Sequence, residues 1–485
     1  MTRRGALVPI AVVLVLGGAV FGWVARFRPV DPDEGAYAIA SRLVLDGELP
    51  YHDFVFTQMP LLPFVYGGWI GVAGESWGAL RLLSVVIALA TAVVLVALVT
   101  RRFGPALGLV AAVLYPLTTG VYAWHTTVKT YALSTFLLFC AFAVVAWAER
   151  PSGRRWLAAG LLCALAIDVR LLFLAAVPAL VLAAGRAHRR VFAAGLGRGV
   201  LPAAVLFALD PELVLFDVLG TQATRSDSGL IGDVRQKWVT AFNLFGVGSE
   251  EGAAGVQFFV LALLAFAALA LAARERRPPP LAILLAVSLG VVSLLPTPAF
   301  PQYFVVTYPF LVFGAIACFD EVRGRLRDTA AVRAVGTVFA SAAALYAGAG
   351  VVDVVPSSSW VSAADDDTEV DAIEEVSGTV ESLTRPGEEV LSWWPGYVFG
   401  THARSALDTL PPPDRPTSLS ADESRRFDYP TLADVERMIR ERRARVIVFR
   451  RWYVGEPETD WGEVVRENGY RLVRTRRGAG IYVAP

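Results

Sequence analysis

The sequence has few charges, few cysteines and few histidines, and each shortage excludes a class of protein. Charged residues make up only 18% of the 485 residues and the formal net charge is +0, so bulk charge gives no case for a nucleic-acid partner. The 3 cysteines all lie in apolar runs, which leaves no disulfide framework and no CxxC metal site. The 4 histidines show no HExxH spacing, and they are His52, His125, His188 and His402. The chain also lacks an internal repeat and a phosphate-binding GxxxxGK loop, which argues against an ATP-driven pump.

Long apolar runs dominate what is present, and at 55% hydrophobic residues they predict a polytopic membrane protein. A run of about 20 apolar residues spans the bilayer, and basic loops tend to stay in the cytoplasm. The basic start "MTRR" therefore predicts a cytoplasmic N-terminus. Residues 6–24 form the first span, an uncleaved anchor because no small-residue cleavage site follows them. Further spans are expected at about 80–100, 105–121, 130–148, 191–209, 256–273, 281–295, 303–319 and 330–352.

The segment "WLAAGLLCALAIDVRLLFLAAVPALVLAAGRAHRR" carries Asp168 and Arg170 near its middle and basic clusters at both ends. The positive-inside rule favours two short helices that form a hairpin, with "DVR" at or near its far end. With the hairpin counted as two, residues 1–352 contain about 11 membrane segments, and a large first loop, residues 26–79, lies outside.

The composition changes at about residue 353 to acids, prolines and arginines, which predicts a soluble domain, residues 353–485, on the outer side. It begins with the acidic linker "SAADDDTEVD". Strands are expected at "EEVLSWW", "ARVIVF", "GYRLVRT" and "GAGIYVAP", and an amphipathic helix at "TLADVERMIRERR" with Thr431 as N-cap. The predicted fold class is a polytopic α-helical membrane protein with a C-terminal soluble α/β domain.

The first outer loop opens with acids, Asp31, Asp33 and Glu34, ahead of the stretch "EGAYAIASRLVL". Apolar residues there recur at spacings of three and four, which predicts an amphipathic helix along the membrane interface. The acids either cap this helix and suit its dipole, or they act in chemistry. A second apolar stretch, "MPLLPFVYGGWIGVAG", has too many prolines and glycines for an ordinary span, so the two elements are expected to roof a cavity.

These residues resemble a family. The pattern DExxY (Asp33, Glu34 and Tyr37), followed by "GELPYHDF" and "QMPLLPF", is similar to the C-type glycosyltransferase (GT-C) superfamily, and most similar to its protein O-mannosyltransferase and lipid A aminoarabinose transferase branch. The hairpin, the late "PQYFVVTYPFL" span and the appended outer domain fit the same family, so the resemblance covers roughly residues 7–352. Many relatives have a Pro-Pro doublet where this chain has Met59-Pro60.

The resemblance implies transfer of a sugar, a hexose such as mannose, from a polyprenyl- or dolichyl-phosphate to an acceptor on the outer face of the membrane. Inverting displacement of a lipid phosphate from an anomeric carbon needs a base for the acceptor hydroxyl and cations for the departing phosphate. By its place in the DExxY pattern, Asp33 is the expected base. Glu34 is its orienting or acceptor-binding partner, Tyr37 belongs to the same site, and Asp31 is the alternative base.

Arg170 and Lys129 are the expected phosphate ligands. Two alternatives stay open: Asp168 neutralises Arg170, and Lys129 only snorkels to the interface beside His125. Gln302 and Tyr303 could bind the phosphate or the sugar, although Tyr303 also suits an interfacial aromatic belt. His52 and Asp53 could bind acceptor or serve as loop structure.

No cofactor is expected, because the branch that uses a lipid monophosphate is generally metal-independent. A divalent cation at Asp31, Asp33 and Glu34 is the disfavoured alternative. In the outer domain, Trp393 and Trp394 form either a sugar platform or the core of a strand. Two other functions also remain open, a transporter with a pathway at Asp168 and Arg170, and a noncatalytic subunit of a cell-surface assembly.

Overall fold

The computed structural model describes residues 3–221, 229–245, 252–354, 368–407, 420–427, 429–450 and 461–485. The chain forms two compact units. The helical unit comprises Met1–Arg26, Ser84–Pro202 and Ser226–Ser362, and the α/β unit comprises Phe27–Leu83, Ala203–Arg225 and Ala363–Pro485. The first loop therefore groups with the C-terminal segment, whereas a division at residue 352 was expected. Residues 362–367 of the predicted acidic linker lie outside the described residues.

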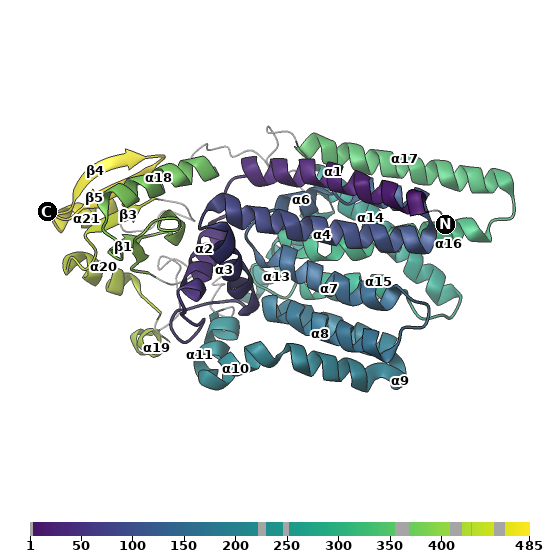
Figure 1. Cartoon of the computed structure of the whole chain (residues 1–485), viewed down its shortest axis with the longest axis horizontal. Helices are drawn as coiled ribbons and strands as arrows, with labels where there is room; N and C mark the ends of the chain where they lie inside the picture. Colours follow the sequence, from purple (N-terminus) through teal and green to yellow (C-terminus); the bar gives the residue numbers. More distant parts are fainter. Residues whose placement is uncertain are drawn as a thin grey trace. The chain divides into compact units, whose positions relative to one another are not determined.

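The helical unit consists of apolar helices (Figure 1). Its elements are α1 (Arg3–Phe27), α4 (Trp77–Phe103), α5 (Pro105–Leu114), α6 (Thr119–His125), α7 (Thr130–Ala146), α8 (Gly153–Val169), η1 (Leu171–Ala175), α9 (Ala176–Gly199), α13 (Gly229–Leu244), α14 (Gly252–Arg274), α15 (Leu281–Val292), η3 (Pro301–Thr307), α16 (Tyr308–Arg325) and α17 (Thr329–Val354). The first residues of α4, up to Leu83, belong to the α/β unit. Among the described residues, 6 helices are long and apolar enough to cross a membrane, or up to 7 if the pair α5 and α6, bent by 63°, is one span. The chain is a multi-pass helical membrane protein, as predicted, while the number of about 11 segments stays a prediction.

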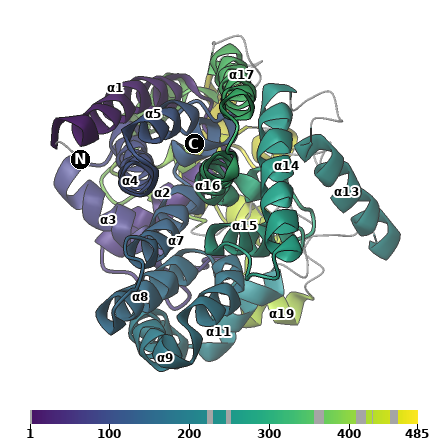
Figure 2. The same cartoon turned by 90° about the vertical axis from the view of Figure 1, so that its right-hand side faces the viewer.

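The predicted hairpin is present in the helical unit. Helix α8 ends at Val169, and the extended backbone of its C-cap Arg170 (φ −153°, ψ 116°) turns the chain through η1 into α9. The two helices pack side by side (Figure 2). Glycines allow this close approach, because a Cβ on Gly160 would lie 2.1 Å from the Phe192 carbonyl oxygen and one on Gly195 would lie 2.1 Å from that of Leu157.

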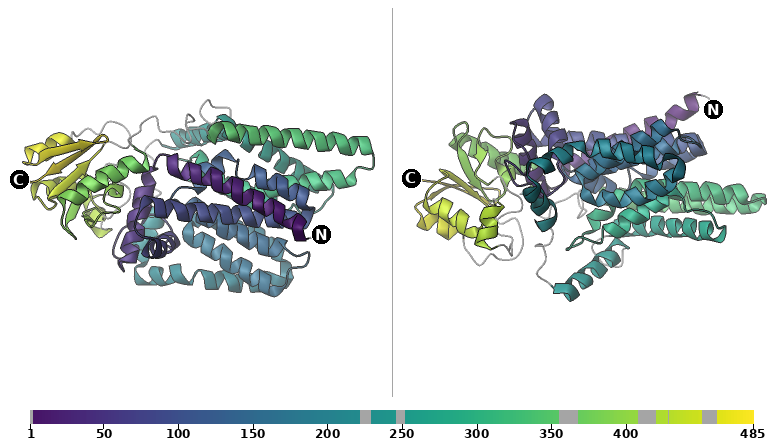
Figure 3. Two further views of the ribbon diagram at one scale, coloured as in Figure 1. Left: turned by 45° about the horizontal axis from the view of Figure 1, so that its top comes forward. Right: turned by 90° about the horizontal axis from the view of Figure 1, so that it is seen from below.

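The C-terminal part of the α/β unit is a small mixed sheet with the strand order β2-β1-β3-β5-β4 (Figure 3). Its strands are β1 (Glu389–Ser392), β2 (Arg404–Ser405), β3 (Val446–Phe449), β4 (Arg471–Arg476) and β5 (Ala479–Val483), and its helices are α18 (Val370–Leu383), α19 (Ala421–Arg426), α20 (Leu432–Arg440) and α21 (Trp461–Glu467). Strand β1 pairs in parallel with β2 and β3, whereas β5 pairs antiparallel with β3 and β4. The four predicted strands and the helix after Thr431 are confirmed.

Both faces of the central strands β1 and β3 are covered, whereas the edge strand β4 is exposed. Leu391 and Ile447 pack in one cluster with Val435 of α20 and Trp461 of α21. The residues that alternate with them along the strands, such as Val446, are also fully buried, and α18 contacts β3. This two-sided burial is why β1 and β3 read as continuous apolar runs.

The first loop contributes two helices to the α/β unit, α2 (Pro32–Leu45) and α3 (Leu61–Ala73). They pack closely because a Cβ on Gly67 of α3 would lie 2.6 Å from the carbonyl oxygen of Ser41. The predicted helix is present, but α2 is buried at every residue from Glu34 to Leu43, so it lacks the exposed face of an amphipathic helix. The same unit contains α10 (Leu201–Leu209), which starts at the unit boundary, α11 (Pro211–Leu215) and η2 (Phe216–Gly220).

Candidate active site

The acids of the DExxY pattern lie at the N-terminus of α2. Asp31 is the N-cap, and its carboxylate accepts the Asp33 amide at 3.0 Å. Glu34 reaches back and accepts the Asp31 amide at 2.8 Å, which completes a capping box with Pro32 in the first turn. The capping alternative therefore describes Asp31, whose carboxylate is engaged by the helix. Asp31 and Asp33 are both partly exposed, and Asp31 is the one whose carboxylate accepts the cap bond.

Glu34 supports this helix through a buried ion pair. The Arg81 guanidinium donates to both of its carboxylate oxygens, from Nε to Oε2 at 3.2 Å and from Nη2 to Oε1 at 2.8 Å. Arg81 also donates to the carbonyl oxygens of Arg28 and Pro29, at 2.8 and 3.1 Å. Glu34 is 0% exposed. Of the two roles expected for Glu34, these contacts favour orientation of the helix over binding of acceptor.

Tyr37 lies one turn after Asp33, so the two share a face of α2. Its ring meets Phe56 edge-on, with ring centroids 6.2 Å apart, and Phe56 in turn contacts Tyr51 and Phe54. Tyr37 is buried, and its carbonyl oxygen accepts the Ser41 hydroxyl at 2.6 Å. An aromatic wall therefore flanks the face of α2 on which Asp33 lies.

His52 and Asp53 lie in the turn that follows α2. Their side chains are 55% and 40% exposed, and His52 Nε2 is 4.0 Å from Asp53 Oδ1. Asp53 Oδ2 accepts the Leu49 amide at 2.7 Å, which closes the turn. The bond from Leu49 to Asp53 belongs to loop structure, and both side chains are exposed enough to contact an acceptor as well.

Asp217, in η2, is a buried acid of the same unit that sequence reasoning missed. Its Oδ2 accepts the Phe56 amide at 2.9 Å, while the buried Oδ1 has no hydrogen-bond partner among the described residues. Burial raises the pKa of Asp217 to about 8, with the Phe56 amide opposing the shift and Asp210 adding to it. The only signal in the sequence is a single acid within the apolar stretch "LVLFDVLG".

The helical unit brings the predicted phosphate ligands together. Lys129 is the N-cap of α7, and its Nζ lies 5.1 Å from the Trp124 ring centroid and 5.8 Å from that of Tyr131. Arg170 Cζ lies 4.7 Å from the centroid of Tyr131 and 4.8 Å from that of Tyr303. Both cations are buried, at 4% and 9% exposure, and they share one aromatic neighbour.

Contacts around Arg170 bear on the alternative that Asp168 neutralises it. Arg170 Nη1 donates to the Thr130 hydroxyl at 3.2 Å. Both carboxylate oxygens of Asp168 are buried without a hydrogen-bond partner among the described residues, so the two side chains form no hydrogen-bonded pair. Gln302 is partly exposed at the start of η3, next to Tyr303, which is buried against Arg170 and is not part of an exposed belt.

Two other expectations concern His125 and the paired tryptophans. His125 is fully buried in α6, with Nδ1 3.5 Å from the Tyr115 hydroxyl. Trp393 packs on Trp461 in the domain core, with centroids 4.5 Å apart, and Trp394 is 3% exposed, so burial favours the core alternative over a sugar platform. In the described parts of the chain, no group of three or more His, Cys, Asp or Glu could hold a metal ion.

Comparisons with known proteins agree with this architecture. Residues 57–212 match the family model described as dolichyl-phosphate-mannose-protein mannosyltransferase. No curated protein sequence matches the chain. The fold is similar to that of ArnT from Cupriavidus metallidurans in the apo state, with a TM-score of 0.67 at 14% identity over 98% of this chain and 97% of that one.

Two further structures share the fold. ArnT from the same organism bound to undecaprenyl phosphate matches with a TM-score of 0.67 at 14% identity, over 99% of this chain and 98% of that chain. The Archaeoglobus fulgidus oligosaccharyltransferase tethered to an acceptor peptide matches with a TM-score of 0.50 at 12% identity, over 93% of this chain and 69% of that chain. The resemblance to the C-type glycosyltransferases expected from the sequence is therefore confirmed, by the family model over residues 57–212 and by the fold over nearly the whole chain.

Proposed function

We propose that this chain is a membrane glycosyltransferase that moves a sugar from a polyprenyl- or dolichyl-phosphate to an acceptor on the outer face of the cytoplasmic membrane. The observation that carries the proposal is the gathering of two buried cations, Lys129 and Arg170, around the ring of Tyr131. A structure of similar fold contains undecaprenyl phosphate, and the matched family is named for dolichyl-phosphate-mannose. Both relatives thus point to a lipid carrier that ends in a phosphate.

Lys129 and Arg170 would bind the phosphate and stabilise it as it leaves. A buried site lowers the local dielectric, so each cation interacts with the developing negative charge more strongly than it would in water. Arginine also offers paired donors to a phosphate, whereas lysine acts as a point charge. Gln302 and Tyr303 are proposed to add hydrogen bonds to the phosphate or to the sugar.

Asp33 would act as the general base. It takes the proton from the acceptor hydroxyl, and the acceptor oxygen attacks the anomeric carbon. The bond from that carbon to the phosphate oxygen breaks, its electron pair leaves with the lipid phosphate, and the configuration inverts. Asp33 suits this role because it is partly exposed at a helix N-terminus, where the dipole favours the carboxylate. Tyr37, His52 and Asp53 are proposed to contact the acceptor, and the proposed sugar is a hexose such as mannose.

Turnover by the purified full-length chain in lipid nanodiscs tests the proposal. Radiolabelled undecaprenyl- and dolichyl-phosphate hexoses are supplied with protein, glycan and lipid acceptors, with and without a chelator. We expect acceptor-dependent transfer that the chelator leaves unchanged, since no metal is proposed to take part. A folded protein that consumes none of the donors and binds no lipid phosphate would contradict the proposal and favour a transporter or a noncatalytic subunit.

The phosphate site has its own test with a matched control. Arg170→Met and Lys129→Met should each weaken binding of undecaprenyl phosphate about tenfold, the effect of losing one charge-assisted contact. Lys237→Met is the control, because that lysine lies on α13 and donates to the Leu295 carbonyl oxygen at 3.0 Å. Equal weakening by all three variants would show that general positive charge, and not the group around Tyr131, attracts the lipid.

A further inference from the structure

Trp394 of the C-terminal domain lies directly on the first turn of α2. Its indole N–H donates to the Pro32 carbonyl oxygen at 2.8 Å. A Cβ on Gly35 would lie between 2.5 and 2.7 Å from three atoms of the same indole, so only glycine leaves room for the ring. The contacts at Pro32 and Gly35 bracket Asp33 and Glu34 in the chain. The position of this ring therefore fixes the backbone that carries the proposed base.

Trp394 is itself held in place by other rings. It stacks on Trp77, the first residue of α4, with ring centroids 5.8 Å apart and an interplanar angle of 8°. Tyr397 packs against it edge-on at 4.9 Å, and Phe399 packs edge-on against Trp77 at 5.4 Å. Because Trp394 is only 3% exposed, it cannot move without displacing these neighbours.

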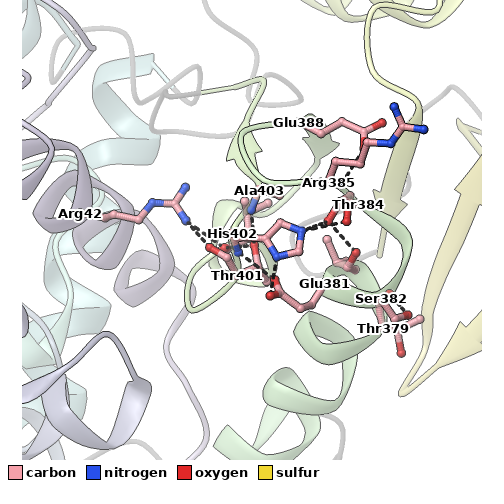
Figure 4. Close-up of polar contacts among 12 residues, drawn as sticks. Arg42, Thr379, Glu381, Ser382, Thr384, Arg385, Glu388, Thr401, His402 and Ala403 are labelled. Carbon is pink, nitrogen blue, oxygen red and sulfur yellow. Dashed lines mark hydrogen bonds and ion pairs between the residues drawn. The ribbon is translucent and has the colours of Figure 1, made fainter.

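A second contact lies near the other end of α2. Arg42 Nη1 donates to the carbonyl oxygens of Val398 and Thr401, at 3.1 and 3.3 Å (Figure 4). It also lies 3.6 Å from Glu75 Oε1, which accepts the Gly400 amide at 2.8 Å. Residues 394–402, here called the docking loop, thus hold α2 at two points along its length.

The docking loop is tied to its own domain through His402. The Nδ1 of His402 lies 2.5 Å from Glu381 Oε1, and its Nε2 lies 2.8 Å from the Thr384 carbonyl oxygen (Figure 4). The His402 amide donates to Glu381 Oε2 at 2.8 Å. Since Glu381 and Thr384 stand at the end of α18, the loop connects α2 to the helix that covers the sheet.

We propose that the docking loop positions the proposed catalytic base, with Trp394 and Arg42 as positioning residues. The inference rests on the proposed function, because it concerns the role of Asp33 in sugar transfer. Asp33 stands in the first turn of a 14-residue helix, where the Glu34–Arg81 pair orients the helix and Trp394 contacts the backbone on both sides of Asp33. A small displacement of a base costs turnover without changing how the donor's phosphate is bound. On this proposal the C-terminal domain contributes to sugar transfer by positioning the base.

Conservative variants test the proposal. Trp394→Phe removes the N–H bond to Pro32, and Gly35→Ala drives a methyl group into the indole. Each should lower kcat about tenfold while KM for the lipid-linked donor and binding of undecaprenyl phosphate stay within about twofold. Arg42→Lys, which keeps the charge, should retain more turnover than Arg42→Gln. Trp393→Phe is the matched control, since Trp393 packs on Phe449 and Trp461, and its kcat should stay within about twofold.

The double variant shows whether the two residues act through one contact. The indole atoms that a Cβ on Gly35 would strike are missing from phenylalanine, so Gly35→Ala should add little loss to Trp394→Phe. Losses that multiply, or an unchanged kcat in both single variants, would overturn the positioning role. A variant that fails to fold is recognised because it also loses binding of undecaprenyl phosphate. If Trp394→Phe fails to fold, the kcat of Gly35→Ala, a change that raises helix propensity, tests the positioning role by itself. A wild-type protein without any transfer would overturn the proposed function itself.

Discussion

The guanidinium of Arg81 contacts both carboxylate oxygens of Glu34 inside the α/β unit, where the two residues are 2% and 0% exposed. The pair joins the start of α4 to the N-terminus of α2 across 47 residues of sequence. A buried ion pair adds little net stability compared with apolar packing, but loss of one partner leaves the other charge uncompensated. The main role of Glu34 is therefore to hold the N-terminus of α2 in position, and not to add stability.

Loss of Arg81 should therefore be costly. We expect Arg81→Met to destabilise the protein by about 3–5 kcal/mol, because it leaves the Glu34 carboxylate buried without its cation. Thermal unfolding in detergent measures the effect. Arg443→Met is the control, since its pair with Glu389 is exposed and worth about 0–1 kcal/mol. The combination of Arg81→Met with Glu34→Leu should recover part of the loss, and a double variant no better than Arg81→Met would contradict this account.

The close packing of α8 on α9 predicts a sharp difference between two glycines of α9. Gly195→Ala would place a Cβ 2.1 Å from the Leu157 carbonyl oxygen, whereas Gly197→Ala meets nothing within 4 Å. Backbone atoms cannot move aside as a flexible side chain can, so we expect Gly195→Ala to cost about 1–3 kcal/mol. Gly197→Ala should be neutral or slightly stabilising. Yield of folded protein and apparent Tm measure both, and equal behaviour of the two variants would argue against the hairpin.

Asp217 predicts a pH dependence of stability. Its folded-state pKa of about 8 lies above the ordinary value of 3.8, so between these two pH values the folded state holds a proton that the unfolded chain has lost. Stability should therefore fall as pH rises through this range. The asparagine of Asp217→Asn cannot ionise, and it can still accept the Phe56 amide. Because this side chain then binds no proton in either state, the apparent Tm of the variant should fall less than that of the wild type between pH 5 and 8. Parallel Tm profiles for the two proteins would refute the assignment.

The cap of α20 predicts a local effect in the C-terminal domain. The Thr431 hydroxyl accepts the Asp434 amide at 3.2 Å, and Asp434 Oδ2 accepts the Thr431 amide at 2.9 Å. Thr431→Ala should cost about 1 kcal/mol, while Thr431→Ser keeps the hydroxyl and most of the stability. Amide hydrogen exchange of residues 432–436 is the measurement. Unchanged protection in Thr431→Ala would mean that tertiary packing alone holds this helix.

Elements with local signals could be predicted from the sequence. Thr431 precedes an amphipathic run with an acid at the third helical position, and the basic clusters at both ends of the α8–α9 segment required a chain reversal near Arg170. Arg170 and Lys129 could be chosen singly, as rare cations near or within apolar runs. Their common contact with Tyr131 could not be predicted, because the two residues belong to different helices whose packing no local pattern encodes.

Features that depend on distant pairing escaped prediction for the same reason. The bond from the Phe56 amide to Asp217 joins residues 161 positions apart, and that from Trp394 to Pro32 joins residues 362 apart. The spacing of apolar residues in α2 predicts that its polar face contacts solvent. In the structure α3 and the docking loop cover this helix, so the expected exposed face is absent. The sequence indicates which faces are apolar, but it does not indicate what covers the polar ones.

The central claim, that Asp33 is the base of a sugar transfer from a lipid phosphate, is tested most directly by comparing two Asp→Asn changes in one helix. Asp33→Asn is set beside Asp46→Asn, at the exposed C-cap of α2, and both are assayed for acceptor-dependent transfer of radiolabelled sugar from its lipid-phosphate donor. The account predicts that Asp33→Asn loses about 100-fold or more in kcat, the usual contribution of a general base, while it still binds undecaprenyl phosphate and Asp46→Asn turns over like the wild type. Full transfer by Asp33→Asn would contradict the account.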